Sequence, residues 1–246
     1  MEKAHRIDYQ GEFVVHVTNK VRGQVVQERD WIPNTINEKH TGHALVLGNG
    51  VSRLDYSQYN HLFLAHRGGL HATKKLTTYG CNAAFRDFAP HMLVVNHPFL
   101  AKEVVESGYA DDHIVLTHAK NILKYPNKFH LIPFDPYMDA GSTALYLAAF
   151  DAHNHVYFMG FDGQSPTEPN NNIYAGTFGY AAKTAEVDGT KWIDNAAKVF
   201  DTYTNVEFIR VVSGGGEPMP EKWKYFSNVR QISWRQFVSE VDLGAT

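Results

Sequence analysis

The sequence predicts an α/β protein with a doubly wound, Rossmann-like and mostly parallel sheet. Short apolar runs recur from His43 onward, at intervals long enough for helical crossovers. Near-continuous apolar runs are typical of strands that are buried on both faces, as in a parallel sheet. The chain has no internal repeat or heptad array, which disfavours solenoids, propellers and coiled coils. The predicted strands are 44–47, 76–79, 92–95, 113–117, 129–132, 156–159 and 206–211.

Residues 1–42 are predicted to form an N-terminal β extension. The runs 12–17 and 21–27 carry β-branched residues on either side of Thr18-Asn19-Lys20, a pattern typical of a β-hairpin. Residues 43–246 then form a single α/β domain.

Two helices are predicted between the later strands. Residues 142–152 are rich in good helix formers, with Gly141-Ser142 as the expected N-terminal cap, and a second helix runs from about residue 190 to 202. Residues 163–189 interrupt the alternation with Gly, Pro, Ser, Asn and Tyr, and form either a lid-like substrate loop or a surface insertion. Residues 234–238 predict a short terminal helix that covers the sheet edge.

Composition narrows the class of protein. The chain has 246 residues with 43% hydrophobic and 20% charged residues, which excludes global disorder. A net charge of -3 gives no overall bias toward nucleic acid. The single cysteine, Cys81, predicts a reducing compartment, and no apolar run reaches the length of a membrane span. We therefore expect a cytoplasmic protein that neither enters the membrane nor binds nucleic acid.

The most informative motif is the turn Gly48-Asn49-Gly50, which is followed closely by Ser52. Glycines allow a ligand to approach backbone N–H groups, and a following helix N-terminus favours phosphate. The motif lacks the third glycine of the dinucleotide-binding fingerprint, because Arg53 stands there. It also lacks the Gly-Lys-Ser/Thr ending of a Walker phosphate-binding loop. It predicts either a phosphate cradle or an ordinary strand-to-helix turn.

Polar residues follow the other predicted strands, where ligands bind in open α/β sheets. These residues are Asn82, Asn96-His97, His118, Asp135 and Asp162. An asparagine can recognise a base, a ribose or a sugar hydroxyl with its carbonyl and amide groups. The alternative is that each of these residues caps a turn.

Taken together, these motifs resemble the bacterial lipooligosaccharide sialyltransferases. A more distant similarity is to archaeal 6-hydroxymethylpterin diphosphokinases and flagellin-glycosylation accessory proteins. The matching features are residues 47–52 together with residues 54–57, the pair Cys81-Asn82, residues 94–96 ahead of a proline, and the block of residues 139–162. The resemblance covers residues 43–162, with a weaker continuation through 200–211.

The resemblance implies that the domain 43–246 binds a cytidine monophosphate (CMP) sugar donor. The matching positions are Asn49, Gly50, Ser52, Asn82 and Asn96, beside Gly48 of the same turn. Gly141 belongs to the family's small-residue turn, where Ala140 replaces a serine and Ser142 lies close by. Tyr157 aligns with a tyrosine near the donor phosphate, or is a core residue.

The chain departs from the family pattern in its catalytic residues. The family's catalytic histidine follows the Gly-x-Asp strand, but this chain has no histidine beyond His155, and Gly163-Gln164 replace a second tyrosine. His97 and His118 are therefore the candidate proton acceptors. Asp162 is predicted to bind a metal, orient a ribose or cap a turn.

No metal site or tightly bound cofactor is expected, although the diphosphokinase alternative requires Mg²⁺. His153 and His155 lack a nearby third zinc ligand, and Cys81 is predicted to be structural.

The favoured function is a nucleotide-binding, sialyltransferase-like glycosyltransferase that uses a CMP-sugar or a similar donor. The alternatives are a pterin-type phosphotransferase and a non-catalytic nucleotide-binding protein. The expected partners are a small-molecule nucleotide or nucleotide sugar and a glycan-type acceptor. The sequence leaves the oligomeric state open.

Overall fold

The computed structural model describes residues 3–6, 13–18, 25–28, 43–55, 76–162, 172–182, 190–212 and 218–241. In the N-terminal region, β2 (Phe13–Thr18) pairs antiparallel with β3 (Val25–Glu28), which confirms the predicted hairpin. A third strand that was not predicted, β1 (Lys3–Arg6), pairs antiparallel with the other side of β2.

The main domain contains an eight-stranded sheet in which every described pair of neighbouring strands is parallel. The order across the sheet is β11-β10-β9-β4-β5-β6-β7-β8. The predicted α/β fold class is confirmed, and β11 is a strand that was not predicted. The bounds are β4 (His43–Leu47), β5 (Thr77–Cys81), β6 (Met92–Val94), β7 (Ile114–Thr117), β8 (His130–Leu131), β9 (His155–Met159), β10 (Glu207–Val212) and β11 (Val229–Ser233).

The strand order reverses between β4 and β9. From β4 the chain adds strands toward one edge as far as β8, and it then returns to place β9 on the other side of β4. In open α/β sheets this switch point opens a crevice beyond the carboxyl ends of the two strands, because the following connections leave toward opposite faces. The carboxyl ends of β4 and β9 are therefore the expected position of a ligand.

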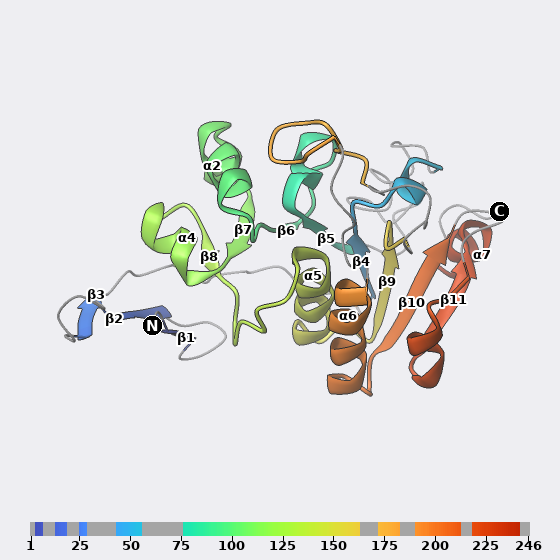
Figure 1. The fold of residues 1–246 in the computed structure, drawn as a ribbon. Coiled ribbons are helices and arrows are strands. Elements are labelled where there is room, and N and C mark those ends of the chain that lie inside the picture. Colours follow the sequence, from blue (N-terminus) through green and yellow to red (C-terminus); the bar gives the residue numbers. More distant parts are fainter. Residues whose placement is uncertain are drawn as a thin grey trace.

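Helices cover both faces of the sheet (Figure 1). α5 and α6 pack on one face, whereas α2, α4 and α7 pack on the other. The bounds are α2 (Pro98–Glu106), α3 (Tyr109–Asp112), α4 (Ala119–Lys124), α5 (Ala140–Phe150), α6 (Thr190–Thr202) and α7 (Trp234–Glu240), with 3-10 helices η1 (Val51–Asp55), η2 (Asn82–Arg86) and η3 (Glu221–Tyr225). Among the helices of the described ranges, none combines the length and the hydrophobicity needed to cross a bilayer.

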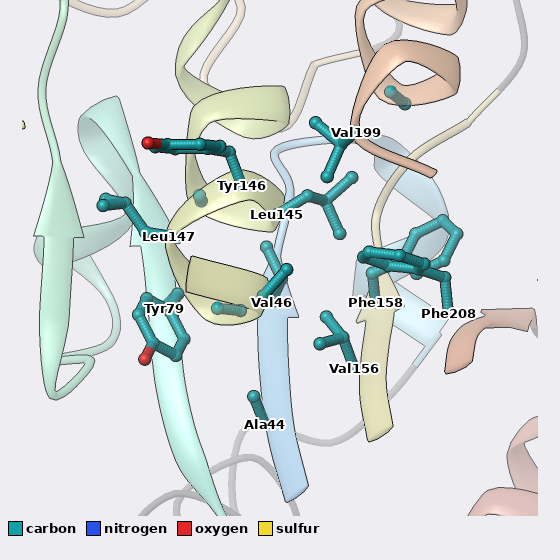
Figure 2. Packing of buried hydrophobic residues seen from close by; sticks show 14 of the residues in the cluster. Ala44, Val46, Tyr79, Leu145, Tyr146, Leu147, Val156, Phe158, Val199 and Phe208 are labelled. Carbon is teal, nitrogen blue, oxygen red and sulfur yellow. The ribbon is translucent and has the colours of Figure 1, made fainter. Parts of the chain in front are cut away.

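The central strands are buried on both faces, as their continuous apolar runs predict. In β4, Ala44 and Val46 face the cluster that contains α5, while Leu45 and Leu47 belong to the cluster that contains α7. Figure 2 shows Leu145 of α5 packed over Val46 and close to residues of β9. Because α5 is apolar around its circumference, it is buried between the sheet and α6 and holds its N-terminus in a fixed position.

Two details of the predicted helices are wrong. The N-cap of α5 is Asp139 rather than Gly141-Ser142, because the Asp139 side chain accepts a hydrogen bond from the Ser142 backbone and the helix already begins at Ala140. The terminal helix α7 packs on a face of the sheet rather than along its edge. Its Phe237 contacts Tyr157 of β9, and β11 itself forms that edge.

Candidate functional site

A cavity of about 450 Å³ lies at the switch point. Its walls come from the turns after β4, β5 and β9, from the N-terminal ends of α5 and α6, and from the loop 172–180. Six of the candidate residues from the sequence line it: Gly48, Asn49, Gly50, Asn82, Gly141 and Asp162. The other lining residues are Cys81, Tyr137, Met138, Asp139, Ala140, Gly160, Phe161, Asn172, Tyr180, Lys191 and Trp192.

The glycines of the first turn bring two strand ends into close contact. The backbone N–H of Gly48 donates to Met159 at 2.8 Å, and the N–H of Gly50 donates to the carbonyl of Gly160 at 2.8 Å. A Cβ at Gly48 would lie 2.4 Å from the Gly160 oxygen, so glycine is required for this approach. These amide groups therefore join β4 to β9, and they are not available to a phosphate.

Asp162 fills the remaining part of the predicted phosphate cradle. Its carboxylate accepts a hydrogen bond from the Ser52 backbone N–H at 2.8 Å and another from the Ser52 hydroxyl. The negative charge thus lies at the start of η1, where anions are favourable. Ser52 is one of the predicted binding residues, but it supports Asp162 and does not line the cavity.

Asn49 has its amide orientation fixed by two neighbours. Its Nδ2 donates to the carbonyl of Cys81 at 3.3 Å and to the hydroxyl of Tyr180 at 3.4 Å. Because a backbone carbonyl only accepts, the other side-chain atom must be the oxygen. This Oδ1 is buried and has no hydrogen-bond partner among the described residues. Asn49 thus lines the cavity and holds a buried acceptor that no described residue satisfies.

Asn82 and Asn96 are linked to each other. The backbone N–H of Asn96 donates to Oδ1 of Asn82 at 3.3 Å, and Asn82 adopts a positive φ of 48°. The Asn96 amide donates to the carbonyl of Met138 at 2.9 Å, which ties β6 to the loop before α5. Asn82 lines the cavity, whereas Asn96 lies behind it and positions Asn82 and Met138.

The start of α5 and a lysine of α6 give the cavity a positive side. Ala140 and Gly141 line it at the first turn of α5, where backbone N–H groups have no partner within the helix. Asp139 is already engaged, since it accepts from Ser142 at 2.9 Å and from Asn195 at 3.1 Å. Lys191 lines the same wall and is exposed. A helix N-terminus next to an ammonium group is suited to a phosphate.

The described part of the predicted lid-like segment, residues 172–182, is fixed against the sheet. The N–H of Ile173 donates to the Asn49 carbonyl at 2.9 Å. The hydroxyl of Tyr174 accepts from the buried Arg53 at 2.8 Å and donates to Asp87. Burial raises the pKa values of Tyr174 and Tyr180 above those of free tyrosine. This segment is thus a wall of the cavity that also holds Asn49.

A second arginine, Arg86, also holds this segment. Arg86 pairs with both oxygens of Glu103, at 2.8 and 2.6 Å, and donates to Thr177 at 2.6 Å and to the Phe178 carbonyl at 2.7 Å. The hydrogen bond to Glu103 raises the pKa of Arg86 further, so this side chain stays charged.

Besides Ser52 and Asn96, four further candidate residues do not line the cavity. Tyr157 lies on the opposite face of the sheet, where it donates to Glu240 at 3.2 Å, because alternate residues of β9 face opposite sides. Ser142 is buried behind the first turn of α5. His97 is exposed at the start of α2 against Phe99. His118 pairs with Asp135 and stacks on Tyr137, a residue of the cavity lining.

The structure also gives the surroundings of Cys81, His153 and His155. Cys81 is only 4% exposed, and burial raises its pKa to about 12, as expected for an inert thiol. The buried His153 contacts the Tyr79 hydroxyl at 3.2 Å, and His155 stacks on His43. Within the described ranges, no group of three or more His, Cys, Asp or Glu residues is arranged to hold a metal ion.

Sequence reasoning missed Asp139, Lys191, Tyr137 and Tyr180. An aspartate three residues before Ser142 is an N-cap signal that would have identified Asp139. The other three come from loops and a helix start, and only the folded chain brings them to the strand ends.

Comparisons with protein-family models, with curated proteins and with solved structures found no match to this chain.

Proposed function

We propose that the cavity binds a cytidine nucleotide and that the protein is a glycosyltransferase-like enzyme with a CMP-sugar donor. The observation that carries the proposal is the convergence of Asn49, Asn82, the α5 N-terminus and Lys191 on one cavity at the switch point. A carboxamide acceptor and an aromatic wall suit the base of a nucleotide, and the positive end of the cavity suits its phosphate. The cavity volume of about 450 Å³ lies in the range of small-molecule sites.

The phosphate is assigned to the first turn of α5 and to Lys191. In the turn after β4, the Gly48, Gly50 and Ser52 N–H groups are already bonded to protein acceptors. At α5, Ala140 and Gly141 line the cavity, and the exposed Lys191 adds a positive charge. In a transfer reaction this positive end stabilises the leaving phosphate.

The base is assigned to the side of Asn49. Its fixed Oδ1 needs a donor, and the exocyclic N4 amine of cytosine supplies one, whereas O4 of uracil only accepts. The ring of Tyr180 lines the same wall and offers a surface for the base. This assignment predicts that CMP binds more tightly than uridine monophosphate (UMP).

The diphosphokinase alternative receives less support from the residues present. It requires Mg²⁺, and the two carboxylates of the lining are Asp139 and Asp162. Both accept hydrogen bonds from protein donors, and Asp162 uses both of its oxygens. These residues do not fit a prepared magnesium site, so no step is assigned to a metal.

The direct test is thermal unfolding with CMP, UMP, AMP and GMP, without metal and with Mg²⁺. A ligand at one hundred times its Kd stabilises the folded state by about 2.7 kcal/mol, a readily measured rise in Tm. We expect the largest rise with CMP and a smaller rise with UMP. If none of the four nucleotides raises the Tm, the proposal is wrong.

A second assay separates an enzyme from a nucleotide-binding protein without turnover. The protein is incubated with CMP-N-acetylneuraminate and lactose, and both free CMP and sialylated lactose are quantified. The transferase proposal predicts stoichiometric formation of the two products. CMP binding without either product supports the non-catalytic alternative.

A further inference from the structure

The loop between β8 and α5 exposes two aromatic rings, of which Tyr137 lines the cavity. Phe134 and Tyr137 are 71% and 72% exposed, and both adopt the left-handed backbone conformation, with φ values of 46° and 52°. For a residue other than glycine this conformation carries a strain cost. Burial of the rings does not offset that cost. At Tyr137 the conformation is instead held by contacts with Asp135 and His118.

Asp135 organises the neighbouring groups with both of its oxygens. Oδ1 accepts a hydrogen bond from the Tyr137 backbone N–H at 2.9 Å, and Oδ2 pairs with Nδ1 of His118. The Asp135 side chain is 10% exposed, whereas that of His118 is 21% exposed. The carboxylate therefore fixes the orientation of the imidazole and directs the ring proton to Nδ1.

The His118 ring in turn supports Tyr137. Their centroids are 5.7 Å apart and the rings are nearly parallel, at 12°. One face of Tyr137 thus rests on the imidazole, while the residue remains open to solvent and also lines the cavity. An open aromatic face at the mouth of a polar site suits a molecule that has apolar C–H groups on one side and hydroxyl groups around its edge.

We infer that Tyr137 and His118, oriented by Asp135, form the acceptor half of the site, which binds a saccharide. This inference rests on the proposed nucleotide-sugar function of the same cavity. A sugar ring stacks on Tyr137, and one of its hydroxyls gives its proton to Nε2 of His118. The hydroxyl oxygen bonds to the anomeric carbon of the donor sugar, while the bond from that carbon to the phosphate oxygen breaks and CMP leaves with the electron pair.

His97, the other histidine considered from the sequence, has a different setting. It is exposed at the start of α2 beside Phe99, and it has no contact with a lining residue of the kind that His118 makes with Tyr137 among the contacts of the described residues. Asp135 gives His118 a carboxylate partner that orients its imidazole, as a general base requires. We therefore assign the role of proton acceptor to His118 rather than to His97.

The test uses saturation-transfer NMR on the full chain with galactose, N-acetylglucosamine and lactose, each with and without CMP. We expect transfer to at least one of the sugars with the wild-type protein and loss of that transfer in Tyr137→Ala. Tyr137→Gly is a second variant, because glycine adopts the positive φ without strain and protects the fold. Tyr225→Ala is the matched control, since Tyr225 is an exposed tyrosine of η3 outside the cavity lining.

The role of His118 has its own readout, the ring-nitrogen resonances of ¹⁵N-histidine-labelled protein, assigned with His118→Gln. We expect a proton on Nδ1 in the free protein and a shift of the Nε2 resonance when the binding sugar is added. A proton on Nε2, or no shift with a bound sugar, overturns the assigned role.

The acceptor site is overturned if no sugar shows saturation transfer, or if transfer is equal in Tyr137→Ala. Thermal unfolding with CMP on the same samples reports on the donor site separately. CMP binding without sugar binding refutes the acceptor half alone. Sugar binding at Tyr137 without any nucleotide binding refutes the proposed function and leaves a saccharide site.

Discussion

The carboxylate of Asp162 accepts hydrogen bonds from both the backbone N–H and the hydroxyl of Ser52. The protein thereby supplies its own anion at the turn where the sequence predicts a phosphate. A Cβ on Gly50 would lie 2.5 Å from the same carboxylate, so the glycine is needed for this contact. The turn after β4 is consequently a rigid support for Asn49, and the positive end of the cavity lies at α5 and Lys191.

Asp162→Asn tests whether this contact stabilises the fold. The amide has one acceptor oxygen where the carboxylate has two, and it lacks the negative charge that strengthens both hydrogen bonds. Hydrogen bonds to a charged group contribute about 1.5–3 kcal/mol, and we expect a loss of that size in the free energy of unfolding. Urea unfolding measures it, with the exposed Asp112→Asn as the control. Equal stability of the two variants would contradict the assignment.

Loss of the hydroxyl is expected to have different effects at the buried Tyr174 and at Tyr109, a half-buried residue whose hydroxyl is buried. In Tyr174→Phe, Arg53 and Asp87 each lose a partner, and we expect a loss of about 1.5–3 kcal/mol. The buried Tyr109 hydroxyl has no partner among the described residues. Tyr109→Phe should therefore leave stability unchanged or raise it. The measurement is the denaturant midpoint of each variant, and a larger loss for Tyr109→Phe would refute the account.

The thiol of Cys81 is expected to be unreactive in the folded protein. Its pKa is raised to about 12 by burial, so the protonated form predominates at pH 8 and the nucleophilic thiolate is scarce. Native protein should react with iodoacetamide far more slowly than protein unfolded in urea. Because the chain has one cysteine, mass spectrometry reports this site without ambiguity. Equally fast labelling of native and unfolded protein would show that Cys81 is accessible.

Lys191→Met tests the assignment of the phosphate. Removal of the ammonium group should weaken CMP binding about tenfold, which is about 1.4 kcal/mol, and leave cytidine binding unchanged because cytidine lacks the phosphate. Lys198→Met, on the same helix but outside the cavity lining, is the matched control. Calorimetry with the two ligands makes the comparison. If both affinities fall equally, the phosphate does not lie at Lys191.

The sheet was predictable from the sequence because its central strands, such as β4 and β9, are apolar on both faces. The edge strand β11 was missed, since Val229–Ser233 mixes polar and apolar residues and lacks that signal. The helix of 190–202 was predicted with its observed bounds, helped by well-spaced apolar residues.

The site was predictable only in part. The search for polar residues directly after predicted strands identified Asn49, Asn82 and Asp162, and these residues do meet at the cavity. The hydrogen bonds that the Gly48 and Gly50 N–H groups donate to the end of β9 could not be predicted from the sequence. They depend on how the turns after β4 and β9 meet in the folded chain. Lys191 was missed because α6 lies beside α5 only in the folded chain.

The most direct measurement is calorimetric titration of CMP into the wild-type protein and into Asn49→Ala, Asn82→Ala and Asn154→Ala. Asn154 is exposed at the amino end of β9, at the opposite end of the sheet from the cavity. We expect saturable binding of CMP, a reduction of about tenfold or more in Asn49→Ala and Asn82→Ala, and wild-type affinity in Asn154→Ala. Absence of binding to the wild-type protein, or equal affinity in all four proteins, would contradict a nucleotide site at the switch point.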